Sequence, residues 1–465
     1  MSYRHTLLAL AFCATAAHAS DMTLDRAIDL ALTQNRDLQR AETLLDDSTA
    51  DVEAASAQFD FHIQPLLSIQ RIGDEQLKNY GLAVSKEFEM GTTINASATR
   101  GDTVLPDGVV MVQPAVSVSI TQPLFRNLGA ARNTVHEHDA ESLATTARRR
   151  YEEMRQQLVT TVVDRYTELF RLQQQIKVDE LDVQHSTELM RLTSAYELVG
   201  RSKHLDTLRA AFQRDQAEGL LSADHQRLVT AQADFADLLG FPTTSAFIAQ
   251  PTGWADFSSL DLDAATQTAL QNRLDYAQAL QDYVDSGREL AAADNGLLPD
   301  IGVTVGYQRY DQSPLPGSSV PAGGGVFLGL TGNSVLQDPE AKAAARKGRT
   351  DREAARQNVG IVQAAISRDV AEGVTGYQQA RTENDIAARA SAGADARLRL
   401  ARELFHMGRA DSFAVADAEQ AYVQSQATLL NANAEVTRAS YRLSQVLGTL
   451  LAPPDDLKPP ARGTR

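Results

Sequence analysis

Few side chains in this sequence have the types and spacing that enzyme chemistry requires. His136 and His138 lie two positions apart in a segment expected to be helical, so they point to different faces, unlike metal ligands four positions apart. No Gly-x-Ser-x-Gly segment provides a hydrolase nucleophile. The glycine run at 323–325 lacks the following Lys-Ser/Thr of a phosphate-binding loop. The sequence therefore predicts no catalytic residue, no metal site, no cofactor and no enzyme activity.

Composition excludes further classes of function. The chain has 465 residues, with 44 Lys+Arg against 60 Asp+Glu and a net charge of −16 at pH 7, and this acidic balance argues against a nucleic-acid partner. Hydrophobic residues make up 43% and charged residues 22%, which are ordinary values for a folded protein. The single Cys rules out a disulfide framework. No apolar run reaches the length of about 18 residues typical of a spanning helix.

Residues 1–19 have the features of a secretory signal peptide. Arg4 precedes a short apolar stretch, and Ala17-His18-Ala19 supplies the small residues that a signal peptidase recognises, so we expect cleavage after Ala19. Cys13 lies within the apolar stretch, where the preceding Phe12 argues against lipidation. The mature protein is therefore expected to be exported and free of cysteine.

The remaining chain contains an internal duplication. Five residues near the start of each copy match at a constant offset: Leu24, Asp25, Ala27, Ala31 and Leu32 against Leu262, Asp263, Ala265, Ala269 and Leu270. Near the ends, Gly200, Arg201, Ala210, Leu239 and Gly240 match Gly408, Arg409, Ala418, Leu447 and Gly448. Duplication on this scale indicates two structural repeats. The predicted division is a first repeat at 20–240, a linker at 241–261, a second repeat at 262–450 and a disordered tail at 451–465.

Each repeat contains a very long helix that turns back as a second helix. Residues 130–198 contain neither Pro nor Gly, and apolar side chains recur every three or four positions, as expected for a coiled-coil stripe. The stripe consists of Met154, Leu158, Val162, Tyr166, Leu169, Leu172 and Ile176. At ~1.5 Å per residue this helix would be roughly 100 Å long. The first helix hairpin is expected over 130–240 and the second over 349–448, and a soluble four-helix coiled coil would give the same pattern.

Each repeat also has extended segments between its short and long helices. They fall within 61–124 and 299–332, and Ala115–Gln122 alternates almost strictly between Val or Ile and Ser or Thr. Such alternation over about ten residues fits a barrel wall between lipid and water, although a soluble sheet with one buried face alternates in the same way. An exported chain without a spanning helix favours the barrel. Four strands, or six if the longer first hairpin is counted, cannot close a barrel in one chain, so oligomerisation is implied.

The order and duplication of these features resemble the TolC family of outer-membrane efflux proteins over nearly the whole mature chain. The residues that carry the resemblance are Thr23, Leu24, Ala27, Ala31, Leu32 and Asn35, Gln122-Pro123-Leu124-Phe125 with Gly129, Val199-Gly200, Met407-Gly408, Leu238-Leu239-Gly240 and Val446-Leu447-Gly448.

This resemblance implies an α+β fold in a homotrimer: a 12-stranded transmembrane β-barrel, with about four strands per chain, continued by a coiled-coil α-helical tunnel. It implies passive transport through an outer-membrane lipid bilayer, with a periplasmic membrane fusion (adaptor) protein and an inner-membrane pump or ABC transporter as partners. Efflux and type I secretion are both compatible with it. The alternative function is a periplasmic coiled-coil adaptor or scaffold without a channel.

The resemblance also assigns candidate site residues at the two helix tips. Acids beyond the tip glycines would form a cation-attracting constriction, and basic residues near them would pair with these acids in the closed state. The gate candidates are Asp206, Asp411, Asp417, Phe405, Arg201 and Arg409. Val199, Gly200, Met407 and Gly408 would form the tip turns and contact the adaptor, and Pro123, Phe125 and Gly129 would form a strand-to-helix junction.

Three departures from the family pattern are visible. The first extended region is about thirty residues longer than the second, and the second copy has Asn333-Ser334-Val335-Leu336 where the first has Gln-Pro-Leu-Phe. A family tyrosine near the second tip is replaced by Phe405, so its hydrogen bond is lost. The acids could equally cap helix ends without gating. Neither the substrate nor the cognate pump follows from these residues.

Overall fold

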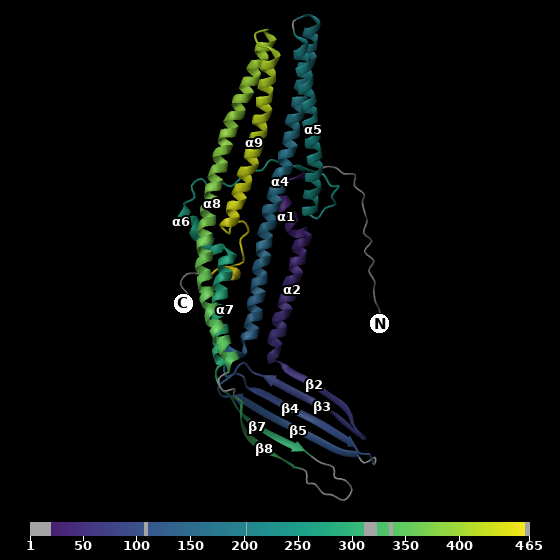
Figure 1. Cartoon of the computed structure of the whole chain (residues 1–465), viewed down its shortest axis with the longest axis vertical. Helices are drawn as coiled ribbons and strands as arrows, with labels where there is room; N and C mark the ends of the chain where they lie inside the picture. Colours follow the sequence, from purple (N-terminus) through teal and green to yellow (C-terminus); the bar gives the residue numbers. More distant parts are fainter. Residues whose placement is uncertain (1–19, 107–109, 201, 311–322, 334–337, 461–465) are drawn as a thin grey trace. The chain divides into compact units, whose positions relative to one another are not determined.

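The structure is a computed structural model that describes residues 20–106, 110–200, 202–310, 323–333 and 338–460. The predicted signal peptide, Arg201 and residues 334–337 lie outside these described residues. Long helices and antiparallel strands make up the chain (Figure 1). Within the described ranges, we find no helix with the length and apolar character needed to cross a bilayer.

The duplication is visible in the lengths of the helices. The first repeat has α1 (Leu24–Gln34), α2 (Arg36–Ser56), the short α3 (Ala130–Asn133), α4 (Val135–Leu198) and α5 (His204–Leu238). The second has α6 (Leu262–Asn272), α7 (Leu274–Asn295), α8 (Pro339–His406) and α9 (Ser412–Val446). The opening helices α1 and α6 both have 11 residues, and the returning helices α5 and α9 both have 35. The structure thus repeats two shorter helices, a long helix and a returning helix in the same order.

Caps encoded in the sequence determine where the opening helices begin. Thr23 accepts a hydrogen bond from the Arg26 N–H at 3.4 Å, and Asp261 accepts one from the Ala264 N–H at 3.1 Å. Asn35 separates α1 from α2: its side-chain oxygen accepts from the N–H of Leu38, and its amide donates to the carbonyl of Leu238 at 3.0 Å. Asn35 therefore ties the start of the first repeat to its end.

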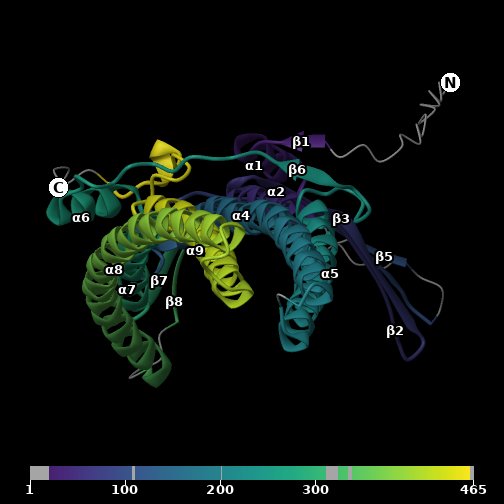
Figure 2. The same ribbon diagram turned by 90° about the horizontal axis from the view of Figure 1, so that it is seen from above.

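The chain forms two compact units, each made of segments from both repeats. The first contains residues 1–42, 151–274 and 365–465, and the second contains 43–150 and 275–364. In the first unit, α9 lies between α8 and α4, with α5 beyond α4 (Figures 1 and 2). Its hydrophobic core combines the stripe of α4 with residues of α1 and of the return helix α5, including the fully buried Tyr166, Leu169 and Phe235. Met154, which was expected in this stripe, is instead 44% exposed.

The predicted linker contains regular structure. Strand β6 (Phe247–Ala249) lies within 241–261 and pairs in parallel with β1 (Ser20–Met22). The hydroxyl of Tyr166 donates to the carbonyl of Gln250 at 2.8 Å, and the hydroxyl of Tyr377 donates to that of Ala255 at 3.0 Å. One buried tyrosine from each repeat therefore holds the segment that joins the repeats.

The expected disorder of the tail is wrong for its described part. Residues Asp455–Leu457 form a short 3-10 helix, and Leu457 is only 1% exposed. Its sequence, rich in Pro and charge, suggested a solvated chain, but a single apolar side chain in a buried position is enough to order it.

The second unit contains a six-stranded antiparallel sheet, where four strands per chain were expected. The strands are β2 (Phe61–Ile72), β3 (Glu75–Glu87), β4 (Thr93–Val104), β5 (Val110–Pro123), β7 (Asp300–Tyr310) and β8 (Gly323–Asn333), in that spatial order. The longer first region thus folds into four strands rather than one hairpin. The pairing of β5 with β7 joins the two repeats in one sheet.

The register gives this sheet two different faces. Paired residues share a face, and one row runs Ile63, Val84, Ala96, Val118, Tyr307 and Val326 across all six strands. The adjacent row runs Gln64, Ala83, Ser97, Ser117, Gln308 and Gly325 on the opposite side. We call these the apolar face and the polar face. On the polar face, hydroxyls bridge neighbouring strands, with 2.8 Å between Ser97 and Ser117 and 3.0 Å between Thr121 and Thr304.

Candidate functional site

The two long helices end in matching glycine turns. Gly200 has φ +71° and Gly408 has φ +69°, and a Cβ at either position would meet no atom within 4 Å. Glycine is therefore required by the left-handed backbone rather than by lack of space. The residues just before them are exposed: Val199 by 67% and Met407 by 59%. The tips thus present apolar side chains to solvent, as expected of a contact surface.

Two of the predicted gate acids cap the returning helices. The Asp411 carboxylate accepts a hydrogen bond from the Ala414 N–H at 2.9 Å at the start of α9. Asp206 lies in the first turn of α5 and accepts from the Lys203 N–H at 3.3 Å. A carboxylate at a helix N-terminus also interacts favourably with the helix dipole. Within one chain, both acids therefore stabilise the turns that follow the tip glycines.

Asp417 has a partner that the sequence analysis did not identify. It forms an ion pair with Arg397 of α8, and both side chains are about half exposed. Arg409, the expected partner, contributes its N–H to the tip turn by donating to the carbonyl of Leu404 at 2.8 Å. The structure therefore links Asp417 to the rising helix of its own hairpin, and Arg201 lies outside the described residues.

Phe405 connects the two hairpin tips. Its ring lies 6.0 Å from that of Tyr196 on α4, centroid to centroid, at an angle of 54°. Such an aromatic pair contributes about 0.5–1.5 kcal/mol beyond the apolar area that it buries. The loss of the family hydroxyl at this position thus leaves an aromatic contact between α4 and α8. Sequence reasoning missed Tyr196, although it lies four residues before Gly200.

Glu197 stabilises the first tip turn. Its carboxylate accepts a hydrogen bond from the Thr207 hydroxyl at 2.6 Å and lies 2.8 Å from Nδ1 of His204. The hydrogen bond from Thr207 and then that with His204 lower the pKa of Glu197 below its ordinary value. This pair of contacts joins the last turn of α4 to the first turn of α5.

A carboxyl pair is buried between α4 and α5. Asp179 is 4% exposed and Asp224 is 8% exposed. The side-chain amide of Gln175 donates to Oδ1 of Asp179 at 2.7 Å, while Oδ2 of Asp179 has no hydrogen-bond partner among the described residues. Burial, and then the neighbouring carboxyl of Asp224, raise the pKa of Asp179 to about 6. Asp179 therefore keeps its proton to a higher pH than a solvent-exposed Asp does.

The second hairpin buries an acid beside a base. Glu419 on α9 has a side chain that is 4% exposed and lies 3.0 Å from the guanidinium of Arg402 on α8. Burial raises the pKa of Glu419, and Arg402 opposes that rise. From α4, Asp182 also acts to raise the pKa of Glu419, and burial and then Arg402 lower the pKa of His185. This cluster spans the interface of the two hairpins.

Further from the tips, Arg438 joins α9 to α4. Its Nε donates to the Thr167 hydroxyl at 3.0 Å, and its guanidinium lies 3.5 Å from the carboxylates of Asp164 and Glu168. Arg171, and then Arg438, lower the pKa of Glu168 against the opposing effect of burial. Ion pairs thus connect the two repeats alongside the buried stripe of α4.

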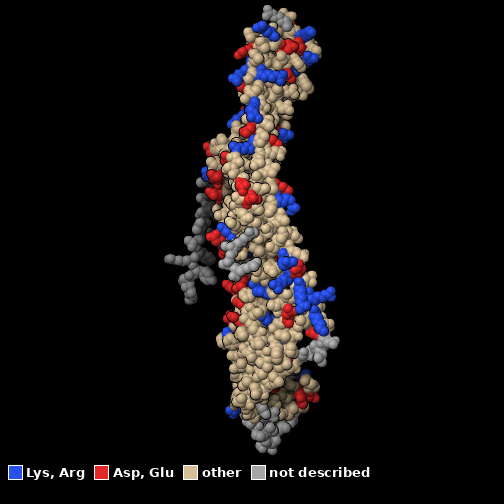
Figure 3. All heavy atoms as spheres, turned by 90° about the vertical axis from the view of Figure 1, so that its left-hand side faces the viewer, with Lys and Arg blue, Asp and Glu red and all other residues tan. Residues whose placement is uncertain are grey.

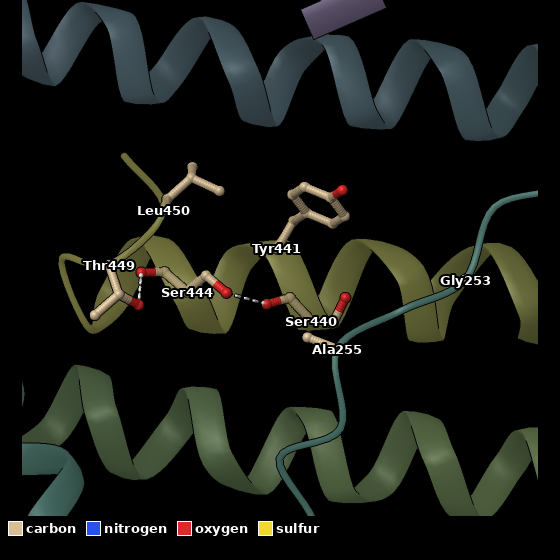
Figure 4. A pocket seen from close by; sticks show the side chains of 7 residues that line it. All are labelled: Gly253, Ala255, Ser440, Tyr441, Ser444, Thr449 and Leu450. Atoms are coloured by element: carbon tan, nitrogen blue, oxygen red, sulfur yellow. Dashed lines mark hydrogen bonds between the residues drawn. The ribbon is translucent and has the colours of Figure 1, made fainter. Parts of the chain in front are cut away.

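A small pocket of about 240 Å³ lies between α9 and the joining segment (Figure 4). Its lining includes Ser440, Ser444 and Thr449, and their hydroxyls bond to the backbone of α9 and its end, as in the 3.0 Å bond from Ser444 to the carbonyl of Ser440. Because these hydroxyls already donate to backbone carbonyls, they do not form a set of hydrogen-bond donors that point together at a ligand. Across the described ranges, His, Cys, Asp and Glu side chains form no cluster of three that could hold a metal ion.

The predicted junction lies at the end of β5. Pro123 is the last residue of that strand, and the Leu124 N–H donates to the carbonyl of Ile301 at 2.8 Å. Phe125 is 46% exposed, and Gly129 adopts φ +100° before α3. Asn133 holds the turn, since its amide donates to the carbonyls of Asn127 and Gly129 at 2.9 and 3.1 Å. The chain therefore passes from strand to helix through a hydrogen-bonded turn.

Comparisons with known proteins agree with this architecture. Residues 265–449 match the family model described as outer membrane efflux protein. The outer membrane efflux protein BepC of Brucella suis is 23% identical over 381 residues, which cover 81% of each chain.

Solved structures match nearly the whole fold. The outer membrane protein VceC of Vibrio cholerae has a TM-score of 0.68 at 16% identity, over 91% of this chain and 96% of that chain. The CmeC outer membrane channel of Campylobacter jejuni has a TM-score of 0.69 at 13% identity, over 93% and 87%. The second repeat thus matches the outer membrane efflux protein family model, the chain is similar over both repeats to an outer membrane efflux protein, and it shares the fold of solved outer-membrane channels.

Proposed function

We propose that this chain assembles as a homotrimer and forms the outer-membrane channel of a tripartite efflux or type I secretion system. The observation that carries the proposal is one sheet with an apolar and a polar face, built into the same chain as two helix hairpins with exposed tips. Transport through it is passive: an inner-membrane pump supplies the energy, and a periplasmic adaptor bridges pump and channel. Cleavage after Ala19 would release the mature chain into the periplasm.

The sheet argues against the alternative of a periplasmic coiled-coil adaptor or scaffold. A soluble sheet buries one face against a core, whereas here the large apolar side chains remain exposed, as with Leu67 at 77% and Leu328 at 76%. Exposed apolar strands of 11 to 14 residues suit a lipid-facing wall.

We infer that the adaptor contacts the tips around Val199, Gly200, Met407 and Gly408, where apolar side chains project into solvent. The gate is proposed to lie just behind them and to use Asp206, Asp411 and Asp417, with Phe405, Arg201 and Arg409 around it. Three-fold symmetry would turn each acid into a ring that attracts cations. The ion pair with Arg397 would tune the charge of the Asp417 ring.

Conductance in planar bilayers, with the mass in detergent measured in parallel, tests the channel. We expect a trimer with small, cation-selective openings. A soluble monomer or dimer without conductance would contradict the proposal and favour the scaffold.

The gate assignment has its own test. Asp417→Ala should weaken block by divalent cations added on the tip side, because the Asp417 ring of the trimer would lose its three carboxylates. Asp395→Ala, which removes an acid of α8 paired with Arg399, is the matched control. Unchanged block in the Asp417 variant would remove this residue from the gate.

A further inference from the structure

Two long strands form the edges of the sheet. Among the residues that the structure describes, β2 (12 residues) pairs only with β3, and β8 (11 residues) pairs only with β7. Edge strands expose a row of backbone N–H and C=O groups, which is costly inside a bilayer and must be satisfied by another strand. Pro65 removes one N–H from β2, and the backbone groups that point away from β3 at the other positions remain available for pairing.

All the exposed large apolar residues of the strands, except Leu66 and Ile72, share the apolar face. They are Phe61, Ile63, Leu67, Ile69, Tyr80, Leu82, Val110, Val116, Val118, Ile120, Val305, Tyr307, Val326, Leu328 and Leu330. In Figure 3 the strand end shows mostly uncharged atoms, while charged side chains are scattered along the helices. The apolar face extends to both edges, with Ile63 at 64% exposure on β2 and Val326 at 78% on β8. Both edge strands therefore carry the same lipid-facing pattern as the centre.

The polar face is equally continuous. On β2 it presents His62, Gln64 and Ser68, and on β8 it presents glycines together with Phe327. The ring of Phe327 covers Gly306 of β7, where a Cβ would lie 2.6 Å from the ring. An aromatic side chain over a strand glycine is a known way to fix strand pairing. β8 is thus a strand of the sheet that pairs with β7 along its whole length, with the two-faced pattern of the other strands.

The strand directions permit closure between copies. Each of the five pairings across the sheet is antiparallel, so β8 runs opposite to β2. Under rotational symmetry, β8 of one copy would meet β2 of the next copy in antiparallel orientation. An even number of strands per chain is what such closure requires.

We propose that β2 of each chain pairs with β8 of a second copy, so that three six-stranded sheets close an 18-stranded barrel rather than the 12-stranded barrel that the family resemblance implies. The inference rests on the proposed trimeric channel and goes beyond it by specifying the seam. In a 12-stranded barrel each chain would supply only β4, β5, β7 and β8, so β4 would be the edge strand. This would require β3 to separate from β4, with which it pairs over 12 residues. Barrel diameter grows roughly linearly with strand number, so the opening would be about 1.5 times as wide, in the range of water-filled porins.

Cysteine cross-linking in outer membranes tests the seam, because Cys13 is the only cysteine and precedes the expected cleavage site. One series combines a cysteine at His62, Gln64 or Ser68 of β2 with one at Gly325, Gly329 or Thr331 of β8. These polar-face positions have room: a Cβ at Gly325 would meet no atom within 4 Å, and one at Gly329 would meet only the Thr304 carbonyl oxygen at 3.9 Å. A matched series replaces the β2 position with Asn95, Ser97 or Thr99 of β4.

We expect oxidation to produce covalent dimers and trimers in the β2/β8 series at the matching register, at least tenfold above the β4/β8 series and above each single-cysteine variant. Intermolecular cross-links from β4/β8 pairs in a trimer that conducts would overturn the 18-stranded seam and leave the channel intact. Dimers from single β2 cysteines would show that β2 pairs with itself and would also overturn it. A monomer in the membrane without cross-links or conductance would contradict the seam and the proposed function together.

Discussion

The two helix hairpins of the first unit share a backbone and differ in how they bury charge. Each rises to a glycine with φ near +70° and returns through 35 residues. Between α4 and α5 two acids, Asp179 and Asp224, lie side by side, whereas between α8 and α9 the buried Glu419 faces Arg402. Duplication thus preserved the turn geometry, which the backbone dictates, and left the buried polar positions free to diverge. The first hairpin raises the pKa of its buried acid, whereas the second gives its buried acid a counter-charge.

Removing the counter-charge should have the largest effect. Arg402→Met would leave the Glu419 carboxylate buried without its partner, which costs about 3–5 kcal/mol in fully buried pairs. Because Arg402 is 32% exposed, we expect about 2–3 kcal/mol, measured as loss of unfolding free energy in detergent. Arg397→Met is the matched control: its pair with Asp417 is half exposed and should contribute less than about 1 kcal/mol. Equal losses in the two variants would contradict the distinction between buried and exposed pairs.

Neutralising Asp179 should raise the unfolding free energy instead of lowering it, and the size of this gain should depend on pH. The folded-state pKa of Asp179 is about 6, above the ordinary value of 3.8, so the folded hairpin keeps a proton that the unfolded chain has released. Stability therefore falls as pH rises from about 4 to about 6 and stays level above. Gln175 and Asp182 face Asp179 from α4, and Asp224 faces it from α5.

The corresponding experiment is Asp179→Asn, followed by hydrogen exchange of α4 and α5 at several pH values. The variant should be more stable than the wild type by about 1–3 kcal/mol at pH 7.5 and nearly equal to it at pH 4. Glu419→Gln in the other hairpin is the comparison, since it removes the partner of Arg402 and should weaken α8 and α9 at pH 7.5. A gain in Asp179→Asn that does not change with pH would contradict a raised pKa at Asp179.

The smallest effect should come from the feature that the hairpins share. Gly200→Ala and Gly408→Ala place a Cβ on a left-handed backbone and should each cost about 1 kcal/mol, because neither meets a steric clash. Gly393→Ala within α8 is the control, where the exposed helical position should gain about 0.5–1 kcal/mol. Thermal unfolding measures all three. A difference between the two tip variants of more than about 1 kcal/mol would mean that the turns are not equivalent.

Patterns that depend on neighbours in the sequence could be predicted. The glycine turns, the helix hairpins and the alternating strands follow from local periodicity, and Pro123 and Gly129 lie at the strand-to-helix junction. The buried acids could not be predicted in the same way. Asp179 lies three residues after Ile176 on the buried stripe, but an acid there is compatible with burial only because α5 and Gln175 surround it. The sequence also left four and six strands per chain open, because β3 and β4 become separate strands only through pairing across the whole sheet.

The two tyrosines that bond to the joining segment anchor each hairpin far from its tip. Tyr166 lies about 32 residues before the end of α4, so the lever arm to the tip measures about 48 Å at 1.5 Å per residue. Tyr377 lies about 29 residues before the end of α8, which gives about 44 Å. A rotation of about 10° about this anchor would sweep either tip through about 8 Å, whereas side chains beside the tyrosines would move by about 1 Å. A partner that binds the tips would therefore need less force to rotate a hairpin than a partner that binds near the joining segment.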